Sequence, residues 1–176
     1  MINEPLIFRF IPPKAPNTLF LDRDGVLNKA VLRGLEISSP RSFDELIISN
    51  DIDALVTPSI LNNWNLVVIS NQPDLARGVI DTSFVEAIND KINSIVPINE
   101  VYICPHQQTK NCACRKPKIG LIKEFYTDHL KINGKKIMVG DRENDLKCAS
   151  KAGMPFVLRK RSYNINLSHS CNLVIK

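Results

Sequence analysis

The residues of this chain best suited to chemistry are two carboxylates at the end of an apolar run. Leu19-Phe20-Leu21 leads into Asp22-Arg23-Asp24-Gly25. Because residues i and i+2 of an extended chain point the same way, Asp22 and Asp24 face one space. Two such anions repel each other unless a cation lies between them, so the pair favours a hard metal ion such as Mg²⁺. Asp-x-Asp-Gly also occurs in ordinary turns and calcium loops, which are the alternatives for this tetrapeptide alone.

Two later apolar runs also end in polar residues. Ser70-Asn71-Gln72 follows Leu66-Val67-Val68-Ile69, and its hydroxyl and backbone N–H groups can hold phosphate oxygens. For this tripeptide alone, a polar turn is the favoured alternative. Gly140-Asp141 ends another run, and the Asp141 carboxylate is placed to complete a Mg²⁺ site with the first pair. Asp145 supports the metal or a bound water, or it caps the following helix.

A basic pair precedes a helix-like segment. In Arg115-Lys116-Pro117, Lys116 can neutralise a phosphate as a compact cation, and Arg115 can hold another phosphate in a bidentate fork. A solvated basic loop is the alternative. The pair is therefore a candidate phosphate-binding element that needs support from the rest of the chain.

Four metal-binding side chains lie within residues 104–114: Cys104, His106, Cys112 and Cys114. Sulfur and imidazole ligands at this spacing are typical of a closed tetrahedral Zn²⁺ site. A local disulfide and buried free cysteines are the alternatives, and a reducing cytoplasm disfavours the disulfide. With no open coordination position, the zinc is expected to be structural and to fold this loop beside the active site. We predict ordinary roles for Cys148 and Cys171, and no evident partners for His129 and His169.

Short apolar segments alternate with helix-like segments along most of the chain. Strands are expected over residues 18–22, 66–70, 99–104, 136–140 and 155–158, and helices over 81–96, 119–130 and 143–152. This alternation predicts an α/β fold with a central, mostly parallel sheet and right-handed crossovers. The candidate residues follow these strands, which is where open α/β sheets place their ligands.

The remaining segments are less regular. Residues 6–11 can form a short edge strand, and residues 26–50 show little helical period apart from a short strand expected over 45–49. Residues 51–56 can begin a helix, with Asp51 near its N-cap. Pro58 should interrupt that helix, and Thr57 should cap a second short turn.

These patterns divide the chain into one domain and two flanking segments. We expect an N-terminal extension over residues 1–17, a single domain over 18–160 and a tail over 161–176. The tail is polar and irregular until Leu173-Val174-Ile175.

Composition is that of a globular protein with 176 residues, of which 44% are hydrophobic and 23% charged. No apolar run is long enough to span a membrane, and the N-terminus lacks a signal-peptide pattern, so we expect a cytoplasmic protein without a membrane partner. The net charge of +5 suits phosphorylated substrates. Only 6% of residues are aromatic, and no basic stripe is interleaved with them, so a nucleic-acid partner is not expected.

Taken in order, Asp22-Arg23-Asp24, Ser70, Lys116 and Asp141 resemble the motifs of the haloacid dehalogenase-like phosphohydrolases, over residues 18 to about 158. The resemblance implies a three-layer Rossmann-like fold. It implies that Asp22 is a nucleophile that forms an aspartyl-phosphate, and that Asp24 is first a general acid and then a base. Ser70 and Lys116 would bind the phosphoryl group. Asp22, the backbone carbonyl of Asp24 and Asp141 would hold Mg²⁺. Because Asp24 must start protonated, we expect its pKa to be raised relative to that of Asp22.

The Cys/His loop with Arg115-Lys116 after it resembles one subgroup of this family. That subgroup contains D-glycero-D-manno-heptose-1,7-bisphosphate 7-phosphatase and the histidinol-phosphate phosphatase domain, and it lacks a large cap domain. Ala76-Arg77-Gly78 favours the first activity, whereas Gly140-Asp141-Arg142 favours the second. Substrate selection would then fall on residues 28–41, on the zinc loop, and on Arg77 or Arg115, which can hold a remote second phosphate.

Our hypothesis is therefore a monomeric, Mg²⁺-dependent phosphatase of a small sugar bisphosphate in heptose synthesis, with structural Zn²⁺. Histidinol-phosphate phosphatase is the near alternative, and polynucleotide 3′-phosphatase is a less favoured one. A zinc-loop binding module with a decayed active site is a hypothesis of a different class, and the intact carboxylate and lysine motifs argue against it.

Overall fold

A computed structural model describes residues 4–170 of the chain. Its main feature is a six-stranded sheet in the order β1-β6-β5-β2-β7-β8. The strands are β1 (Leu6–Arg9), β2 (Asn17–Leu21), β5 (Trp64–Asn71), β6 (Glu100–Cys104), β7 (Lys136–Gly140) and β8 (Phe156–Leu158). Only β1 is antiparallel to its neighbour, and the other pairs are parallel. The predicted α/β fold with a mostly parallel sheet is confirmed, as is the predicted edge strand near the N-terminus.

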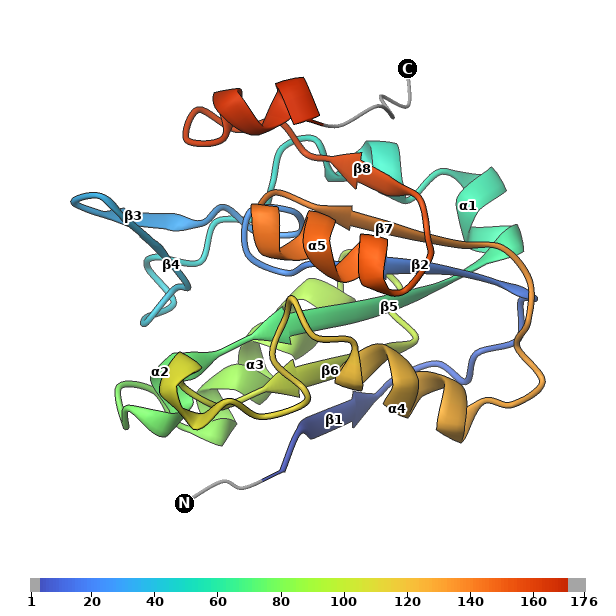
Figure 1. Cartoon of the computed structure of the whole chain (residues 1–176), viewed down its shortest axis with the longest axis horizontal. Helices are drawn as coiled ribbons and strands as arrows, with labels where there is room; N and C mark the ends of the chain where they lie inside the picture. Colours follow the sequence, from blue (N-terminus) through green and yellow to red (C-terminus); the bar gives the residue numbers. More distant parts are fainter. Residues whose placement is uncertain (1–3, 171–176) are drawn as a thin grey trace.

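Helices cover both faces of this sheet, which gives three layers (Figure 1). The α-helices are α1 (Pro58–Asn63), α2 (Pro73–Ala76), α3 (Thr82–Asn93), α4 (Gly120–Asp128) and α5 (Glu143–Lys151). The 3₁₀ helices are η1 (Ile52–Leu55), η2 (Gln108–Lys110) and η3 (Ile165–Ser170). In Figure 1, α4 and α5 lie in front of the sheet and α3 lies behind it. The three long helices that the sequence predicts are confirmed.

Strand β2 shows how the sequence builds the two halves of the core. Its side chains alternate between the faces of the sheet, as expected for an extended chain. Leu19 and Leu21 pack in the cluster that contains Ile88 of α3. Phe20 packs in the opposite cluster, where its ring meets the ring of Phe125 of α4 edge-on at 5.5 Å. Because β2 lies between β5 and β7, the residues that follow it emerge at the centre of the sheet.

Two helix starts follow the capping pattern. The Asp81 carboxylate accepts a hydrogen bond of 2.8 Å from the backbone N–H of Phe84, which satisfies one free donor at the start of α3. Thr57 accepts from the backbone of Ile60 and Pro58 is the first residue of α1, so the predicted cap and short turn are confirmed.

Three local predictions need correction. Residues 45–49 form no strand; Ile48 makes only an isolated bridge to Asn28. The chain forms a hairpin earlier, with β3 (Val31–Arg33) and β4 (Glu36–Ser38), because the left-handed Gly34 supplies its turn. In Figure 1 this hairpin projects beyond the ends of the strands, on the same side as α2.

The other two corrections concern helices. The helix expected over 51–56 is only the 3₁₀ turn η1, and the short helix α2 was not predicted. The tail contains η3, while the predicted apolar end Leu173-Val174-Ile175 lies outside the described residues. Between residues 4 and 170, no helix combines the length and apolar character needed to cross a membrane.

Candidate active site

The first carboxylate stands at the centre of the sheet. Asp22 follows the last residue of β2, and its backbone N–H donates to the carbonyl of Val139 on β7 at 2.9 Å. Its carboxylate oxygen Oδ1 accepts a 2.8 Å hydrogen bond from the backbone N–H of Arg23. Gly25 then turns the chain with a φ of 93°, a left-handed conformation that favours glycine.

Three carboxylates converge beside this strand end. Asp22, Asp141 and Asp145 each offer an oxygen, and these oxygens lie within 4.8 Å of one another. All three residues are buried, and Oδ1 of Asp141 has no hydrogen-bond partner among residues 4–170. A buried, unpaired carboxylate oxygen in an all-oxygen cluster fits a hard divalent cation such as Mg²⁺. The structure thus brings together Asp22 and Asp141 as predicted, and adds Asp145 to the same cluster.

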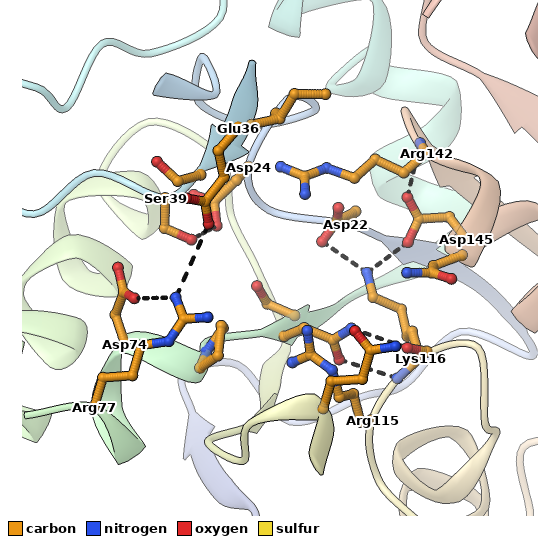
Figure 2. Close-up of a pocket in the computed structure, with 17 residues that line it drawn as sticks. Asp22, Asp24, Glu36, Ser39, Asp74, Arg77, Arg115, Lys116, Arg142 and Asp145 are labelled. Carbon is orange, nitrogen blue, oxygen red and sulfur yellow. Dashed lines mark hydrogen bonds and ion pairs between the residues drawn. The ribbon is translucent and has the colours of Figure 1, made fainter. Parts of the chain in front are cut away.

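Lys116 lies inside this cluster (Figure 2). Its ammonium is 2.7 Å from Oδ1 of Asp22 and 2.7 Å from Oδ1 of Asp145, and it also donates to the carbonyl of Ile69 at 2.7 Å. Asn71 holds the lysine from the side: its amide accepts from the Lys116 backbone N–H at 3.0 Å and donates to the Lys116 carbonyl at 3.1 Å. A single buried cation therefore bridges two of the three carboxylates.

The crowding of these charges shifts their pKa values. Burial and the Asp145 carboxylate raise the pKa of Asp22 to about 8, against the effect of Lys116. Burial and Asp145 likewise raise the pKa of Asp141 to about 6. Burial alone would lower the pKa of Lys116, but Asp145 and Asp22 raise it above its ordinary value. Protonated carboxylates or a bound cation are the two ways to relieve this repulsion.

Asp24 has a different environment from Asp22. Its two oxygens accept hydrogen bonds from Asn28 at 3.0 Å, Ser39 at 2.8 Å and Gln72 at 2.6 Å, and the Arg23 guanidinium lies at 3.2 Å. Burial would raise the pKa of Asp24, but Arg23 and these hydrogen bonds together lower it below its usual range.

The expected order of these two pKa values is therefore wrong for the protein alone. The sequence could not show that four donor side chains surround Asp24, while Asp22 has another buried carboxylate beside it. A divalent cation beside Asp22 favours its ionised form, and a phosphate beside Asp24 favours the protonated form of that residue.

Above the carboxylates opens a polar cleft of about 230 Å³. Its walls come from five parts of the chain: the strand ends, the β3–β4 hairpin, α2, the Cys/His loop and the start of α5. The charged residues that line it are Asp22, Asp24, Glu36, Asp74, Arg77, Arg115, Lys116, Arg142 and Asp145 (Figure 2). The predicted site residues Ser70 and Asn71 also line it.

The two predicted substrate arginines lie in this wall with partners of their own. Arg77 is 3.0 Å from Asp74 and 4.0 Å from Glu36 of the hairpin. Arg115 donates to the backbone carbonyl of His106 at 3.0 Å, which ties it to the Cys/His loop. Both guanidinium groups remain at the cleft, so a substrate would meet them with their orientation already fixed.

The sequence left open whether Asp145 supports the metal or caps the following helix, and its contacts answer this question in part. Its Oδ2 accepts a hydrogen bond from the backbone N–H of Arg142 at 3.1 Å, as part of a capping box at the start of α5. Its Oδ1 contacts Lys116 in the carboxylate cluster. Asp145 therefore caps the helix and shapes the cluster at the same time.

The predicted zinc ligands also converge. The sulfurs of Cys104, Cys112 and Cys114 lie 3.1 to 3.5 Å apart, and Nδ1 of His106 lies 3.2 Å from Cys114 and 3.6 Å from Cys104. Cys112 is half-buried and the other three residues are buried. Three soft sulfurs and one imidazole nitrogen, all within one small sphere, fit a tetrahedral Zn²⁺ site. The loop then runs directly into Arg115 and Lys116 at the cleft.

Comparison with known proteins identifies the family. The model of the polynucleotide kinase 3 phosphatase family matches residues 22–168. The chain belongs to this family. Its fold is that of the haloacid dehalogenase-like phosphatases, and it is a phosphatase. The resemblance drawn from the sequence motifs is thereby confirmed.

Three relatives add detail. A protein from Thermoplasma volcanium named as a probable D-glycero-D-manno-heptose-1,7-bisphosphate 7-phosphatase is 34% identical over 148 residues, which cover 80% of this chain and 97% of that protein. The histidine biosynthesis bifunctional protein HisB from Campylobacter jejuni is 30% identical over 143 residues, which cover 77% of this chain but only 39% of that protein. The crystal structure of a D,D-heptose 1,7-bisphosphate phosphatase from B. bronchiseptica, complexed with magnesium and phosphate, superposes with a TM-score of 0.72 at 28% identity, covering 90% of this chain and 88% of that one.

Several residues of the candidate site had no predicted role. Gln72 belongs to the predicted tripeptide Ser70-Asn71-Gln72, and it donates to both Asp24 and the Ser70 hydroxyl, the latter at 2.8 Å; its i+2 spacing from Ser70 is the signal that could have assigned this role. Ser39 is predicted only within the substrate-selecting segment 28–41, whereas its hydroxyl donates to Asp24. Tyr163 donates to Asp141 from a distant segment, and no local pattern marks it.

One histidine differs from its prediction. His129 has a partner, since its Nε2 lies 2.9 Å from the buried carboxylate of Glu100, far along the chain. Cys148 is buried and free, as expected of an ordinary core cysteine. Cys171 and the side chain of His169 lie outside what the structure describes.

Proposed function

We propose that this chain is a Mg²⁺-dependent phosphomonoester hydrolase that acts through an aspartyl-phosphate on Asp22. The observation that carries the proposal is the arrangement of Asp22, Asp145 and Lys116 at the floor of a polar cleft, with an oxygen of Asp141 within 4.8 Å of those of the other two carboxylates. Phosphoryl transfer needs in-line positioning and charge neutralisation more than covalent chemistry, and this floor supplies both.

Asp22 and Asp24 divide the reaction between them. A carboxylate oxygen of Asp22 attacks phosphorus, the bond to the leaving oxygen breaks, and Asp24 gives that oxygen its proton. Asp24 then takes a proton from water, which attacks phosphorus and breaks its bond to Asp22. Inorganic phosphate leaves and Asp22 is restored.

The hydrogen bonds around Asp24 must rearrange for this role. Asp24 accepts from Ser39 and Gln72 at the cleft wall, and a substrate phosphate brings negative charge beside it. Exchanging one of these hydrogen bonds for a proton makes Asp24 a donor to the leaving oxygen. We expect Ser39 to be the partner that moves, because it directly follows β4 of the projecting hairpin.

Asp22, the backbone carbonyl of Asp24 and Asp141 would hold Mg²⁺, with Asp145 in support. The bound ion supplies charge neutralisation at the phosphoryl oxygens. Lys116 keeps its positive charge beside Asp22, and we propose that it turns one donor toward a phosphoryl oxygen. Ser70 and the backbone at Asn71 complete the phosphate site, while the Asn71 amide holds Lys116 in place.

The Cys/His cluster would hold Zn²⁺ in a structural role. All four candidate ligands come from the protein, so such an ion has no position for substrate. It fixes the loop that carries Arg115 and Lys116 to the cleft.

The substrate that we propose is D-glycero-D-manno-heptose 1,7-bisphosphate, hydrolysed at its 7-phosphate. Arg77, Arg115 and Arg142 line the cleft beside the reacting end and can hold a second, remote phosphate. Relatives that match over nearly their whole length carry this name. The cleft suits a small phosphorylated metabolite that a single chain can bind.

Histidinol phosphate is the second candidate substrate, and the acidic side of the cleft favours it. Glu36 and Asp74 lie in the wall, and Glu36 is well exposed. A carboxylate there can pair with the amine of histidinol phosphate, which a bisphosphate lacks. The HisB relatives match this chain over about two fifths of their length, so their activities come to this chain only as candidates.

A panel of phosphate esters tests both assignments. We would measure kcat/KM with Mg²⁺ for heptose 1,7-bisphosphate, histidinol phosphate, a simple sugar monophosphate and a 3′-phosphorylated oligonucleotide. We expect the heptose bisphosphate to lead by at least about tenfold. A higher kcat/KM for histidinol phosphate or for the oligonucleotide would show that the heptose assignment is wrong. If no ester were hydrolysed with Mg²⁺, the proposed reaction would be wrong.

A further inference from the structure

We propose that Tyr163 and Asn164, beyond the last strand of the sheet, are positioning residues that aim Asp141 at the metal. The inference deepens the proposed function and rests on it. Tyr163 and Asn164 lie in the segment that follows β8, which the sequence places outside the main domain.

Tyr163 acts on one oxygen of the carboxylate. Its hydroxyl donates a hydrogen bond to Oδ2 of Asp141. The other oxygen, Oδ1, is buried and has no hydrogen-bond partner in the part of the chain that the structure describes. Tyr163 therefore pairs with Oδ2 and leaves Oδ1 of Asp141 available to a cation.

Asn164 acts on the backbone of the same residue. Its amide nitrogen donates to the Asp141 carbonyl at 2.7 Å and to the Arg159 carbonyl at 2.9 Å. Its amide oxygen accepts from the backbone N–H of Arg161 at 2.8 Å. Asn164 is buried, so these three hydrogen bonds form away from competing water. The end of β7 is thus joined to the segment that follows β8.

Arg161 joins this segment to the turn after Asp24. Its guanidinium donates to the Gly25 carbonyl at 2.7 Å and is anchored on Asp51 at 2.9 Å. A Cβ atom on Gly25 would collide with the Asp141 carboxylate and lie 2.6 Å from the Tyr163 hydroxyl. The turn, the carboxylate and the tyrosine are therefore in close contact.

These contacts give Asp141 one orientation. A carboxylate that is free to rotate loses conformational entropy when it binds a cation, whereas a fixed one has already lost it. Groups that hydrogen-bond to metal ligands typically change metal affinity by about 10- to 100-fold when they are removed. Tyr163 and Asn164 should therefore affect the metal more than the phosphate ester.

The main experiment measures metal binding without catalysis. We would titrate the full chain with Mn²⁺ and follow the free ion by electron paramagnetic resonance. Tyr163→Phe removes only the hydroxyl and should raise the Mn²⁺ dissociation constant about tenfold. Tyr126→Phe is the matched control, because Tyr126 lies on α4, packs against the core cluster of Phe125 and does not line the cleft. This variant should bind Mn²⁺ like the wild type.

Steady-state kinetics supply the second readout. For Tyr163→Phe, raising Mg²⁺ should restore kcat to within about twofold of wild type, with KM for the ester unchanged. Asn164→Ala should show the same direction of change in Mn²⁺ affinity, with thermal unfolding measured to confirm that it folds. This second variant keeps the test valid if the tyrosine variant is unstable.

The outcomes separate this inference from the proposed function. If Asp22→Asn weakens Mn²⁺ binding but Tyr163→Phe and Asn164→Ala bind Mn²⁺ like the wild type, the positioning role alone is overturned. If Asp22→Asn binds Mn²⁺ as tightly as the wild type, the proposed metal site is wrong and this inference fails with it. Weaker binding by both positioning variants, with normal binding by Tyr126→Phe, supports the inference.

Discussion

The two candidate metal clusters of this chain are built in opposite ways. Cys104, His106, Cys112 and Cys114 come from one loop, and their ligand atoms lie 3.1 to 3.6 Å apart in near-contact pairs. The carboxylate cluster collects Asp22 and Asp141 from the ends of two neighbouring strands, with Asp145 from the helix that follows. The first cluster is local in the sequence, and the second exists only because the sheet forms.

They also differ in what surrounds the ligands. The sulfurs and the imidazole face one another, so an ion among them would be closed off by protein. Asp22 and Asp145 of the carboxylate cluster line a cleft together with the ammonium of Lys116, so an ion bound beside them would lie next to the substrate. Under the proposed function, the Cys/His cluster would serve folding and the carboxylate cluster would serve chemistry.

The largest effect should come from Asp22→Asn. The amide is a poor nucleophile, so kcat should fall by at least about 10³-fold. Zinc content should stay at one ion per chain within error, because the Cys/His loop does not use Asp22. Phosphatase assays and metal analysis on the same sample measure both quantities.

Asp90→Asn provides the control for that change. Asp90 is an exposed acid on α3, away from both clusters, and the variant should keep wild-type activity. Substantial hydrolysis by Asp22→Asn would contradict the nucleophile assignment, and a loss of zinc would contradict the separation of the clusters.

The next effect tests the close approach at the turn. Gly25→Ala places a Cβ atom against the Asp141 carboxylate at a φ of 93°, so the carboxylate cluster must shift. A displacement of about 1 Å in a catalytic group can cost about 10²-fold in rate, and we expect kcat/KM to fall by that order. Steady-state kinetics at saturating Mg²⁺ measure it.

Gly34→Ala is a matched control for backbone strain. Gly34 also has a left-handed φ, of 62°, but a Cβ atom there meets nothing within 4 Å. The variant should cost about 1 kcal/mol of stability and leave the rate unchanged. Equal rate losses in the two variants would show that strain, and not the collision with Asp141, limits the site.

The third effect should appear mainly in stability. Cys114→Ser removes a ligand from the Cys/His cluster, so the chain should lose its zinc and the free energy of unfolding should fall by roughly 3 to 5 kcal/mol. The rate should fall less than in Asp22→Asn, because Arg115 and Lys116 lose their anchor but remain present. Chemical denaturation and metal analysis give the two quantities.

Cys148→Ser controls for burying a hydroxyl in place of a thiol. Cys148 is a buried free cysteine outside the cluster, and its sulfur contacts only the Lys118 carbonyl among the hydrogen bonds of the described chain, at 3.5 Å. The variant should lose about 1 kcal/mol and keep its zinc. A loss of stability in Cys114→Ser no larger than this would mean that the Cys/His loop holds no structural ion.

The contrast between the clusters also explains which features the sequence predicts. The Cys/His ligands follow from spacing alone, because eleven consecutive residues carry all of them. The convergence of Asp22, Ser70 and Asp141 can be predicted because each stands at the end of a strand, and parallel strands bring their carboxyl ends to one edge of the sheet. The strands themselves follow from short apolar runs between helical patterns.

The missed features depend on contacts that no local pattern encodes. Tyr163 reaches Asp141 through the path of the chain after β8, and Ser39 reaches Asp24 through the hairpin. The pKa order of Asp22 and Asp24 depends on the number of donors around each, which only the folded chain shows. The hairpin was missed because its strands have three residues each, too short for a clear alternation.

The smallest effect concerns the clamp on Lys116. The Asn71 side chain makes two hydrogen bonds to the Lys116 backbone, and its amide has no direct role in the proposed reaction. Asn71→Ala should therefore lower kcat/KM about tenfold, since two hydrogen bonds of about 1 kcal/mol each hold the lysine. Zinc content should not change.

Asn93→Ala shows whether that loss belongs to the active site. The Asn93 amide accepts from the backbone N–H of Ile98 at 3.1 Å, so it is a side-chain clamp on the backbone at the end of α3. It should cost about 1 kcal/mol of stability without any change in kcat/KM. If Asn71→Ala lost only stability in the same way, Lys116 would be held by its ion pairs with Asp22 and Asp145 alone, and the carboxylate cluster would position its own cation.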